Sequence, residues 1–256
     1  MIYIIFLTFT ILVLFFAFYQ WQYFMVFNPR YYREDILDER FEMLSIKTKD
    51  GIELEGVVYE PKGAVSTLLF FAGRDHDSVG LIKKLSLSFP TIRVVTFNYR
   101  SYGKSGGSLN EKNIFDDSIL VARMIQKYYG DFYILGFSLG SSVASYVAAE
   151  TDVLGVFLVG AFDNIAELAK RKFKVDLPWL YRYRFDTLEF VKHIDAKVYM
   201  FVSRDDEITY IQNARNLKKN IKNLAYYREY DGLSHHELLW HDDLLQKINK
   251  ISLREI

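Results

Sequence analysis

Apolar and polar positions along the chain follow two patterns that together predict one β-sheet. Residues 41–47 and 52–59 alternate apolar and polar side chains on either side of Asp50-Gly51, a pair typical of hairpin turns. Later apolar runs predict further strands, and a run such as 67–72 is apolar throughout, as expected inside a sheet covered on both faces. These later runs span 67–72, 93–98, 132–135, 153–159, 197–202 and 224–230.

Helical segments are predicted between several of these strands. One runs from about residue 78 until Pro90 stops it, and another runs from about 116 to 129 before the C-terminal cap at Gly130. About eight strands with intervening helices predict an α/β fold whose sheet is antiparallel at its start and mostly parallel afterwards. The segment 161–195 is the one insertion that suits a small cap, and no repeat or second globular domain is evident.

The first 28 residues predict an N-terminal membrane anchor, with the remaining domain at 29–256. No charged side chain occurs from Met1 to Pro29, and an apolar run of this length crosses the roughly 30 Å hydrocarbon core of a bilayer. A cleaved signal peptide is the alternative, but neither a basic start nor a small-residue cleavage site is present. Arg30, Arg33 and Arg40 follow the span, which favours a cytoplasmic domain.

Composition narrows the classes of partner. The 32 basic and 32 acidic residues balance to zero net charge, without a block of one sign, which argues against nucleic acid as a partner. The chain contains no cysteine, so disulfides and cysteine-based zinc or redox sites are excluded.

The strongest chemical signal is Gly136-Phe137-Ser138-Leu139-Gly140. It follows a buried strand and precedes a small-residue helix, as in a G-x-S-x-G turn that exposes a nucleophilic serine. The flanking glycines suit a turn in which a Cβ would collide with the neighbouring helix or strand. The alternative is a plain strand-to-helix turn without chemistry.

A serine nucleophile needs a base and a carboxylate that orients the base. The loop after the strand 197–202 offers Asp205, Asp206 and Glu207, and the loop after 224–230 offers His235 and His236. A zinc helix at His236 is disfavoured because the second histidine of H-E-x-x-H would fall on Trp240. A phosphate-binding loop at 103–105 is disfavoured because Asn98 stands where that motif begins with glycine. His76 and His193 are interpreted as surface or hydrogen-bonded residues, with His76 also a candidate for the pocket mouth.

In combination, five segments resemble the α/β-hydrolase superfamily of serine hydrolases and, within it, the membrane-anchored abhydrolase-domain group. The segments are FFAGRDHD, FNYRSYGKSGGS, GFSLGSS, VSRDDEIT and GLSHHELL, in that order. The resemblance implies an eight-stranded, mostly parallel sheet flanked by helices, and a triad of Ser138, Asp206 and His235. It also implies an oxyanion hole formed by the backbone N–H groups of Leu139 and Arg74. No metal or cofactor is implied.

The resulting hypothesis is a membrane-anchored serine hydrolase that cleaves carboxylic esters or thioesters through an acyl-enzyme. Segment 170–190, which the resemblance places over the pocket, mixes aromatic and aliphatic residues with basic ones, as suits a lipid-like acyl substrate at a membrane surface. The alternative is a small helical cap with a packed inner face and a solvated basic outer face. A non-catalytic binding or scaffold protein of the same fold is the alternative, although such a protein is expected to lack part of the triad. Haloalkane or epoxide chemistry on this fold is disfavoured because it uses a carboxylate nucleophile, where this chain has Ser138.

Overall fold

The computed structural model describes residues 1–32, 38–174 and 176–253. Arg33, one of the basic residues after the predicted span, lies outside the described residues. The strands of the described chain form one eight-stranded sheet in the order β1-β2-β4-β3-β5-β6-β7-β8. The strands are β1 Phe41–Lys47, β2 Glu53–Tyr59, β3 Thr67–Phe71, β4 Arg93–Phe97, β5 Tyr133–Phe137, β6 Gly155–Val159, β7 Lys197–Ser203 and β8 Leu224–Tyr230.

The predicted sheet is confirmed in both composition and direction. β1 and β2 pair antiparallel, as do β2 and β4, whereas the pairs from β4 through β3 to β8 are parallel. Every residue of β3, β5 and β6 is buried, which is why their sequences are apolar runs. The edge strand β1 alternates between exposed and half-buried residues and keeps an alternating sequence.

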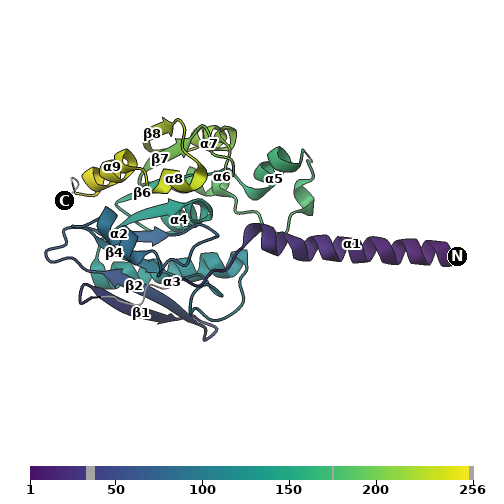
Figure 1. Cartoon of the computed structure of the whole chain (residues 1–256), viewed down its shortest axis with the longest axis horizontal. Helices are drawn as coiled ribbons and strands as arrows, with labels where there is room; N and C mark the ends of the chain where they lie inside the picture. Colours follow the sequence, from purple (N-terminus) through teal and green to yellow (C-terminus); the bar gives the residue numbers. More distant parts are fainter. Residues whose placement is uncertain (33–37, 175, 254–256) are drawn as a thin grey trace.

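Helices cover both faces of this sheet (Figure 1). One buried cluster joins α3, α4 and α7 to the sheet, and a second joins α2, α8 and α9 to the opposite face. Successive residues of one strand alternate between the clusters: Ile134 lies in the first, and Leu135 lies in the second. The helices are α1 Ile2–Val26, α2 Ile82–Ser88, α3 Glu111–Tyr129, α4 Leu139–Glu150, α5 Ile165–Phe173, α6 Thr187–Phe190, α7 Ile211–Lys218, α8 His235–Leu239 and α9 Asp242–Ser252, with 3-10 turns η1 Pro178–Leu180 and η2 Val191–His193.

Two predicted helix starts are wrong. α3 begins at Glu111 rather than near 116 because the side chain of Asn110 accepts a hydrogen bond from the N–H of Asn113 and caps the helix. α2 begins at Ile82 rather than near 78, because Ser78 donates its N–H to the side chain of Asn98 at 2.7 Å and the chain turns before the helix starts.

The N-terminal helix α1 projects from the rest of the molecule (Figure 1). Its 25 residues span about 37 Å at the usual rise of 1.5 Å per residue, and by length and composition it is able to cross a membrane. Only its C-terminal end contacts the sheet domain: Gln22 and Val26 are buried, as is Phe27 just after the helix. The predicted boundary at residue 28 therefore falls inside packed structure, and the division into anchor and domain stays a prediction.

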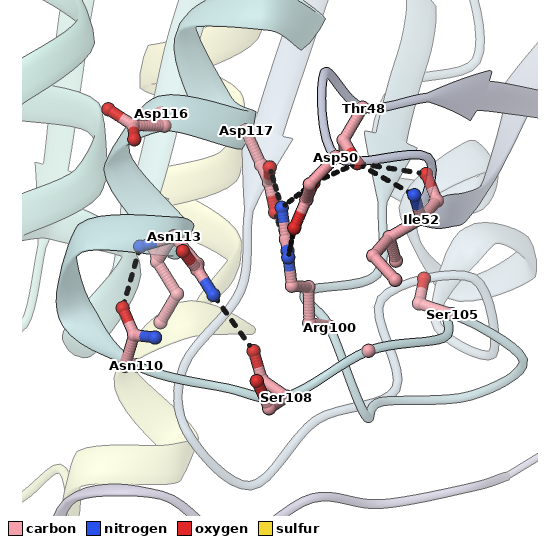
Figure 2. Close-up of polar contacts among 12 residues, drawn as sticks. Thr48, Asp50, Ile52, Arg100, Ser105, Ser108, Asn110, Asn113, Asp116 and Asp117 are labelled. Atoms are coloured by element: carbon pink, nitrogen blue, oxygen red, sulfur yellow. Dashed lines mark hydrogen bonds and ion pairs between the residues drawn. The ribbon is translucent and has the colours of Figure 1, made fainter.

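A buried arginine ties three separated segments together beneath the sheet's first strands. Figure 2 shows Arg100 between Asp50, in the turn from β1 to β2, and Asp117 of α3. Its guanidinium group donates to both carboxylates at 2.6–2.9 Å while the side chain is only 5% exposed. Hydrogen bonds from Arg100 and from the hydroxyl of Thr48 hold the pKa of Asp50 well below its ordinary value. The network fixes the hairpin turn against α3.

Replacing Arg100 by Met is expected to cost about 3–5 kcal/mol of unfolding free energy, because the carboxylate of Asp117 then stays buried without a partner. Urea denaturation of the full chain in detergent, followed by circular dichroism, measures this loss. Adding Asp117→Leu to Arg100→Met should lose less than the sum of the two single changes. Lys112→Met, which removes an exposed ion pair with Asp116, is the control and should cost less than about 1 kcal/mol. Equal effects of Arg100→Met and the control would contradict this account.

Candidate active site

Ser138 stands at a strained turn between β5 and α4. Its φ of 53° and ψ of −120° are unusual for a residue with a Cβ and are held by neighbouring backbone groups. The N–H of Ser138 donates to the carbonyl of Val159 at 2.9 Å, and its own carbonyl accepts from the N–H of Ser141 at 2.8 Å. The turn is thus tied to the neighbouring strand β6 on one side and to its own helix on the other.

The two glycines of the motif are required by contact. A Cβ on Gly136 would lie 2.3 Å from the carbonyl oxygen of Gly140, and a Cβ on Gly140 would lie 2.0 Å from that of Phe71. Both distances are far below contact with a rigid backbone, so only glycine fits. Gly73 is also tight, since its Cβ would come within 3.2 Å of the Ser138 Cβ. The loop after β3 therefore lies directly against the serine.

Two side chains from the loops after β7 and β8 form a buried pair. The Nδ1 atom of His235 lies 2.7 Å from Oδ2 of Asp206, and the two side chains are 2% and 3% exposed. Asp206 also accepts from the hydroxyl of Thr209 at 2.6 Å and from two backbone N–H groups, those of Ile208 and Thr209. Each carboxylate oxygen therefore has donors that fix its direction toward the imidazole.

The environment of Asp206 favours its ionised form. Burial by itself raises the pKa of this carboxyl. The hydrogen bond and charge of His235 and the hydrogen bonds from Thr209 lower the pKa by more than burial raises it. The net pKa lies below the ordinary value for aspartate, so the group is a carboxylate at neutral pH. A carboxylate at Nδ1 keeps the proton of His235 on that nitrogen and leaves Nε2 as the basic atom.

The neighbouring candidates in both loops lie elsewhere. Asp205 is exposed and accepts the N–H of Gly232 at 2.6 Å, which joins the two loops without contact with an imidazole. His236 is exposed, and its ring centroid lies 5.5 Å from that of His235. The geometry therefore pairs Asp206 with His235, as the resemblance implies.

The imidazole of His235 packs at the serine turn. Its ring lies 4.9 Å from the ring of Phe137, the residue before Ser138, and a Cβ on Gly160 would lie 3.1 Å from its Cε1. Within the described residues, no hydrogen bond joins the Ser138 hydroxyl to His235. Nucleophile–base hydrogen bonds are often long in ligand-free enzymes and tighten when substrate binds.

Two backbone N–H groups beside the serine turn have no hydrogen-bond acceptor in the described part of the chain. Leu139 is the first residue of α4, and Arg74 follows Gly73 in the loop after β3; neither N–H donates to an acceptor among the described residues. The carbonyl of Arg74, in the next peptide unit along the chain, accepts from the hydroxyl of Tyr102 at 2.6 Å, which holds the loop just after this N–H. The side chain of Arg74 instead donates to the carbonyl of Met25, near the end of α1.

Ser138 opens into a cavity of about 420 Å³, within the size range of sites for small ligands. Most of the surface that lines the cavity is apolar. The lining comes from six parts of the chain: the end of α1, the loop after β3, the serine turn, the segment from Phe162 through α5, the end of η1 with Tyr181, and the loop after β7. The residues are Phe18, Trp21, Gln22, Met25, Val26, Arg74, Ser138, Leu139, Phe162, Ile165, Leu168, Ala169, Lys172, Phe173, Leu180, Tyr181, Glu207, Ile208 and Thr209.

Several of these contributors were not predicted. Thr209 holds Asp206, and Gln22 lies buried in the wall, yet no motif identifies either residue. A threonine three residues after the acid is a usable signal for Thr209. A lone glutamine inside an otherwise apolar helix is a usable signal for Gln22, because a buried amide needs partners. Among the described residues no group of three or more His, Asp or Glu side chains is arranged to hold a metal.

Comparison with known proteins finds similar sequences and similar folds. No family model matches it. In sequence it is 31% identical over 170 residues to lysophosphatidylserine lipase ABHD12 of Danio rerio and 33% identical over 171 residues to that of Macaca fascicularis. These matches cover 57% of this chain but only 43% and 41% of the relatives, so the chain matches less than half of their length.

Solved structures share the fold across most of the chain. An esterase of Pyrococcus furiosus superposes with a TM-score of 0.69 at 17% identity, covering 87% of this chain and 97% of that one. A serine hydrolase of Xanthomonas campestris described as lacking a lid gives 0.63 at 18% identity, covering 87% and 100%. The α/β-hydrolase fold and the resemblance to the abhydrolase-domain group are thereby confirmed.

His76 generates a pH prediction. Its ring packs 5.7 Å from Phe137, and burial, together with the charge of His236, lowers its pKa to about 4 against the nearby Asp75. As the pH falls below the ordinary pKa of 6.5, His76 binds a proton in the unfolded chain. In the folded chain it binds a proton only near its lowered pKa of about 4. This residue should therefore withdraw up to about 3 kcal/mol of stability as the pH falls through that window.

His76→Phe should remove that share of the acid loss, because phenylalanine binds no proton. The change breaks no hydrogen bond of the Nδ1 atom, which has no partner among the described residues. Urea midpoints of the full chain in detergent at pH 7.5 and pH 5 measure the difference between variant and wild type. His193→Phe, at an exposed position, is the matched control and should leave the acid loss unchanged. An identical acid loss in His76→Phe and wild type would show that His76 is not the group responsible.

Proposed function

We propose that this protein is a membrane-anchored serine hydrolase that cleaves carboxylic esters or thioesters of lipid-like acyl groups through an acyl-enzyme on Ser138. The observation that carries the proposal is the buried His235–Asp206 pair, which packs against the strained Ser138 turn, while Ser138 itself lines a mainly apolar cavity. The sequence relatives are lysophosphatidylserine lipases, which supports a lipid-like acyl substrate.

In the proposed reaction, the Ser138 oxygen attacks the substrate carbonyl while Nε2 of His235 takes the hydroxyl proton. The carboxylate of Asp206 holds the imidazole through Nδ1 and stabilises its positive charge. The negative charge that develops on the carbonyl oxygen meets the N–H groups of Leu139 and Arg74.

Collapse of this intermediate breaks the bond to the alcohol or thiol, which leaves with the proton from His235. Water then attacks the acyl group on Ser138, His235 again takes a proton, and the acid is released with the serine restored. The reaction consumes one water and needs no metal or cofactor.

The anchoring part of the proposal assigns residues 1–28 to a single-pass membrane anchor and 29–256 to the hydrolase domain, with 161–195 as its small cap. The helix α1 supports it by its length and lack of charge. The basic residues Arg30, Arg33 and Arg40 after the span favour a domain on the cytoplasmic side. The proposed partners are an acyl ester or thioester and membrane lipid, with no role for nucleic acid.

Ser138→Ala is expected to lower kcat/KM for p-nitrophenyl butyrate by about 10³-fold or more, because the nucleophile is lost. His235→Ala should be about as damaging, since base and nucleophile act as a unit, and Asp206→Asn somewhat less. Asp205→Asn is the matched control and should have little effect, because Asp205 does not touch the imidazole. Turnover near wild type in Ser138→Ala would exclude the proposal and leave a non-catalytic role for the fold. A larger loss in Asp205→Asn than in Asp206→Asn would mean that the acid is misassigned.

The full chain should stay in the membrane pellet through washes with about 1 M salt and with alkaline carbonate. Such washes remove peripheral proteins. An apolar span is held by hydrocarbon rather than by charge, so neither wash removes it. Immunoblotting of pellet and supernatant reads the result. Release of the full-length chain by either wash is incompatible with an integral anchor.

A further inference from the structure

The wall of the cavity that faces away from the sheet is formed by the anchor helix itself. Phe18, Trp21, Gln22 and Met25 line the cavity, with Val26. The first four follow the spacing i, i+3, i+4 and i+7, so they share one face of α1. Phe24 lies outside this stripe and is 71% exposed. One face of the last two turns of α1 therefore belongs to the cavity, while the rest of the helix does not.

The facing wall comes from α5 in the cap. Ile165, Leu168, Ala169 and Phe173 line the cavity at helical spacing, and the ring of Phe173 lies 6.1 Å from that of Trp21. Both helices therefore contribute mostly apolar side chains to the cavity, which Ser138 and Leu139 also line. A space of this shape suits a single hydrocarbon chain with its carbonyl at the serine.

Polar contacts hold α1 in this position. The amide of Gln22 donates to the carbonyl of Leu180 at 3.0 Å and accepts from the N–H of Arg182 at 2.7 Å. The guanidinium group of Arg182 also lies 4.6 Å from the ring centre of Tyr19. Gln22 is only 5% exposed, so both of its hydrogen bonds are made inside the protein.

A second contact closes the end of the helix. Arg74 donates to the carbonyl of Met25, in the last turn of α1, where a cation also complements the helix dipole. The loop that carries the proposed oxyanion donor and the helix that would cross the membrane are thus directly bonded.

The cavity lies where the span ends. Almost all side chains of residues 2–17 are exposed, which leaves them for lipid, while the cavity begins at Phe18. The aromatic residues Tyr19, Trp21 and Tyr23 lie at the same level, as in the belts that mark membrane interfaces. An acyl chain that lies along α1 therefore meets the first cavity residue at Phe18, in the same cavity that Ser138 lines.

We propose that the last two turns of α1 are one wall of an acyl-chain binding site, and that the acyl chain of a membrane lipid enters between α1 and α5. The proposal rests on the hydrolase function proposed above and adds that the anchor selects the substrate. Removal of α1 would then alter substrate preference as well as location.

The test compares kcat/KM for p-nitrophenyl octanoate and acetate, measured on the full chain in phosphatidylcholine vesicles. In wild type the octanoate-to-acetate ratio should exceed one, since each buried methylene contributes up to about fourfold. Met25→Trp fills the space between the walls and should lower this ratio at least tenfold. The control Phe24→Trp introduces tryptophan at the preceding position, which is exposed and does not line the cavity. It should leave the ratio within twofold of wild type.

Trp21→Ala gives a second measurement, because this side chain is 46% exposed and its truncation leaves the fold in place. Loss of its apolar surface should lower the ratio at least threefold. The proposal is overturned if Met25→Trp and Trp21→Ala match the Phe24→Trp control. It is also overturned if Leu168→Trp in α5 lowers the ratio and neither change in α1 does.

Labelling by a small fluorophosphonate separates failure of this proposal from failure of the hydrolase function. Wild type that labels at Ser138 and prefers octanoate, with unchanged ratios in the α1 variants, overturns the wall assignment alone. Wild type that neither labels nor hydrolyses either ester overturns the hydrolase function and this proposal with it.

Discussion

The whole site depends on one backbone constraint, the positive φ of Ser138. A residue with a Cβ enters this conformation only when its surroundings fix it, and here β6 and the first turn of α4 do so through hydrogen bonds to the Ser138 peptide groups. Gly136 and Gly140 make the turn possible because neither has room for a Cβ against the facing backbone. This turn holds the serine at the C-terminal ends of the strands, where the loops after β3, β7 and β8 begin.

Parallel strands explain why residues far apart in sequence meet at that edge. The carboxyl ends of β3, β5, β7 and β8 lie together, so the loops that carry Arg74, Ser138, Asp206 and His235 converge. The sheet positions these loops, and short-range hydrogen bonds hold their groups: Thr209 and His235 orient Asp206, while Tyr102 holds the loop after β3 at the carbonyl of Arg74. On this scaffold the end of α1 contributes part of the cavity lining.

Sequence reasoning was most successful where the signal is local. Apolar runs identified the central strands β3, β5 and β6, because residues buried on both faces of a sheet are mostly apolar, and alternation around Asp50-Gly51 identified β1 and β2. The G-x-S-x-G glycines report contacts within a few residues. It placed α3 late because the Asn110 cap precedes the apolar periodicity. The role of α1 in the cavity depends on contacts between the end of this helix and the segment at Leu180 and Arg182, about 160 residues later. No local sequence pattern predicts such contacts. Gln22 was the one visible clue.

The most direct test of this account uses a fluorophosphonate whose long alkyl chain ends in a photoactivatable diazirine, applied to the full chain in vesicles and analysed by mass spectrometry. The account predicts phosphonylation of Ser138, absent in Ser138→Ala, with the far end of the chain cross-linked to peptides from residues 18–26 of α1 or 165–173 of α5. Phosphonylation at another residue, or cross-links confined to other parts of the protein, would contradict it.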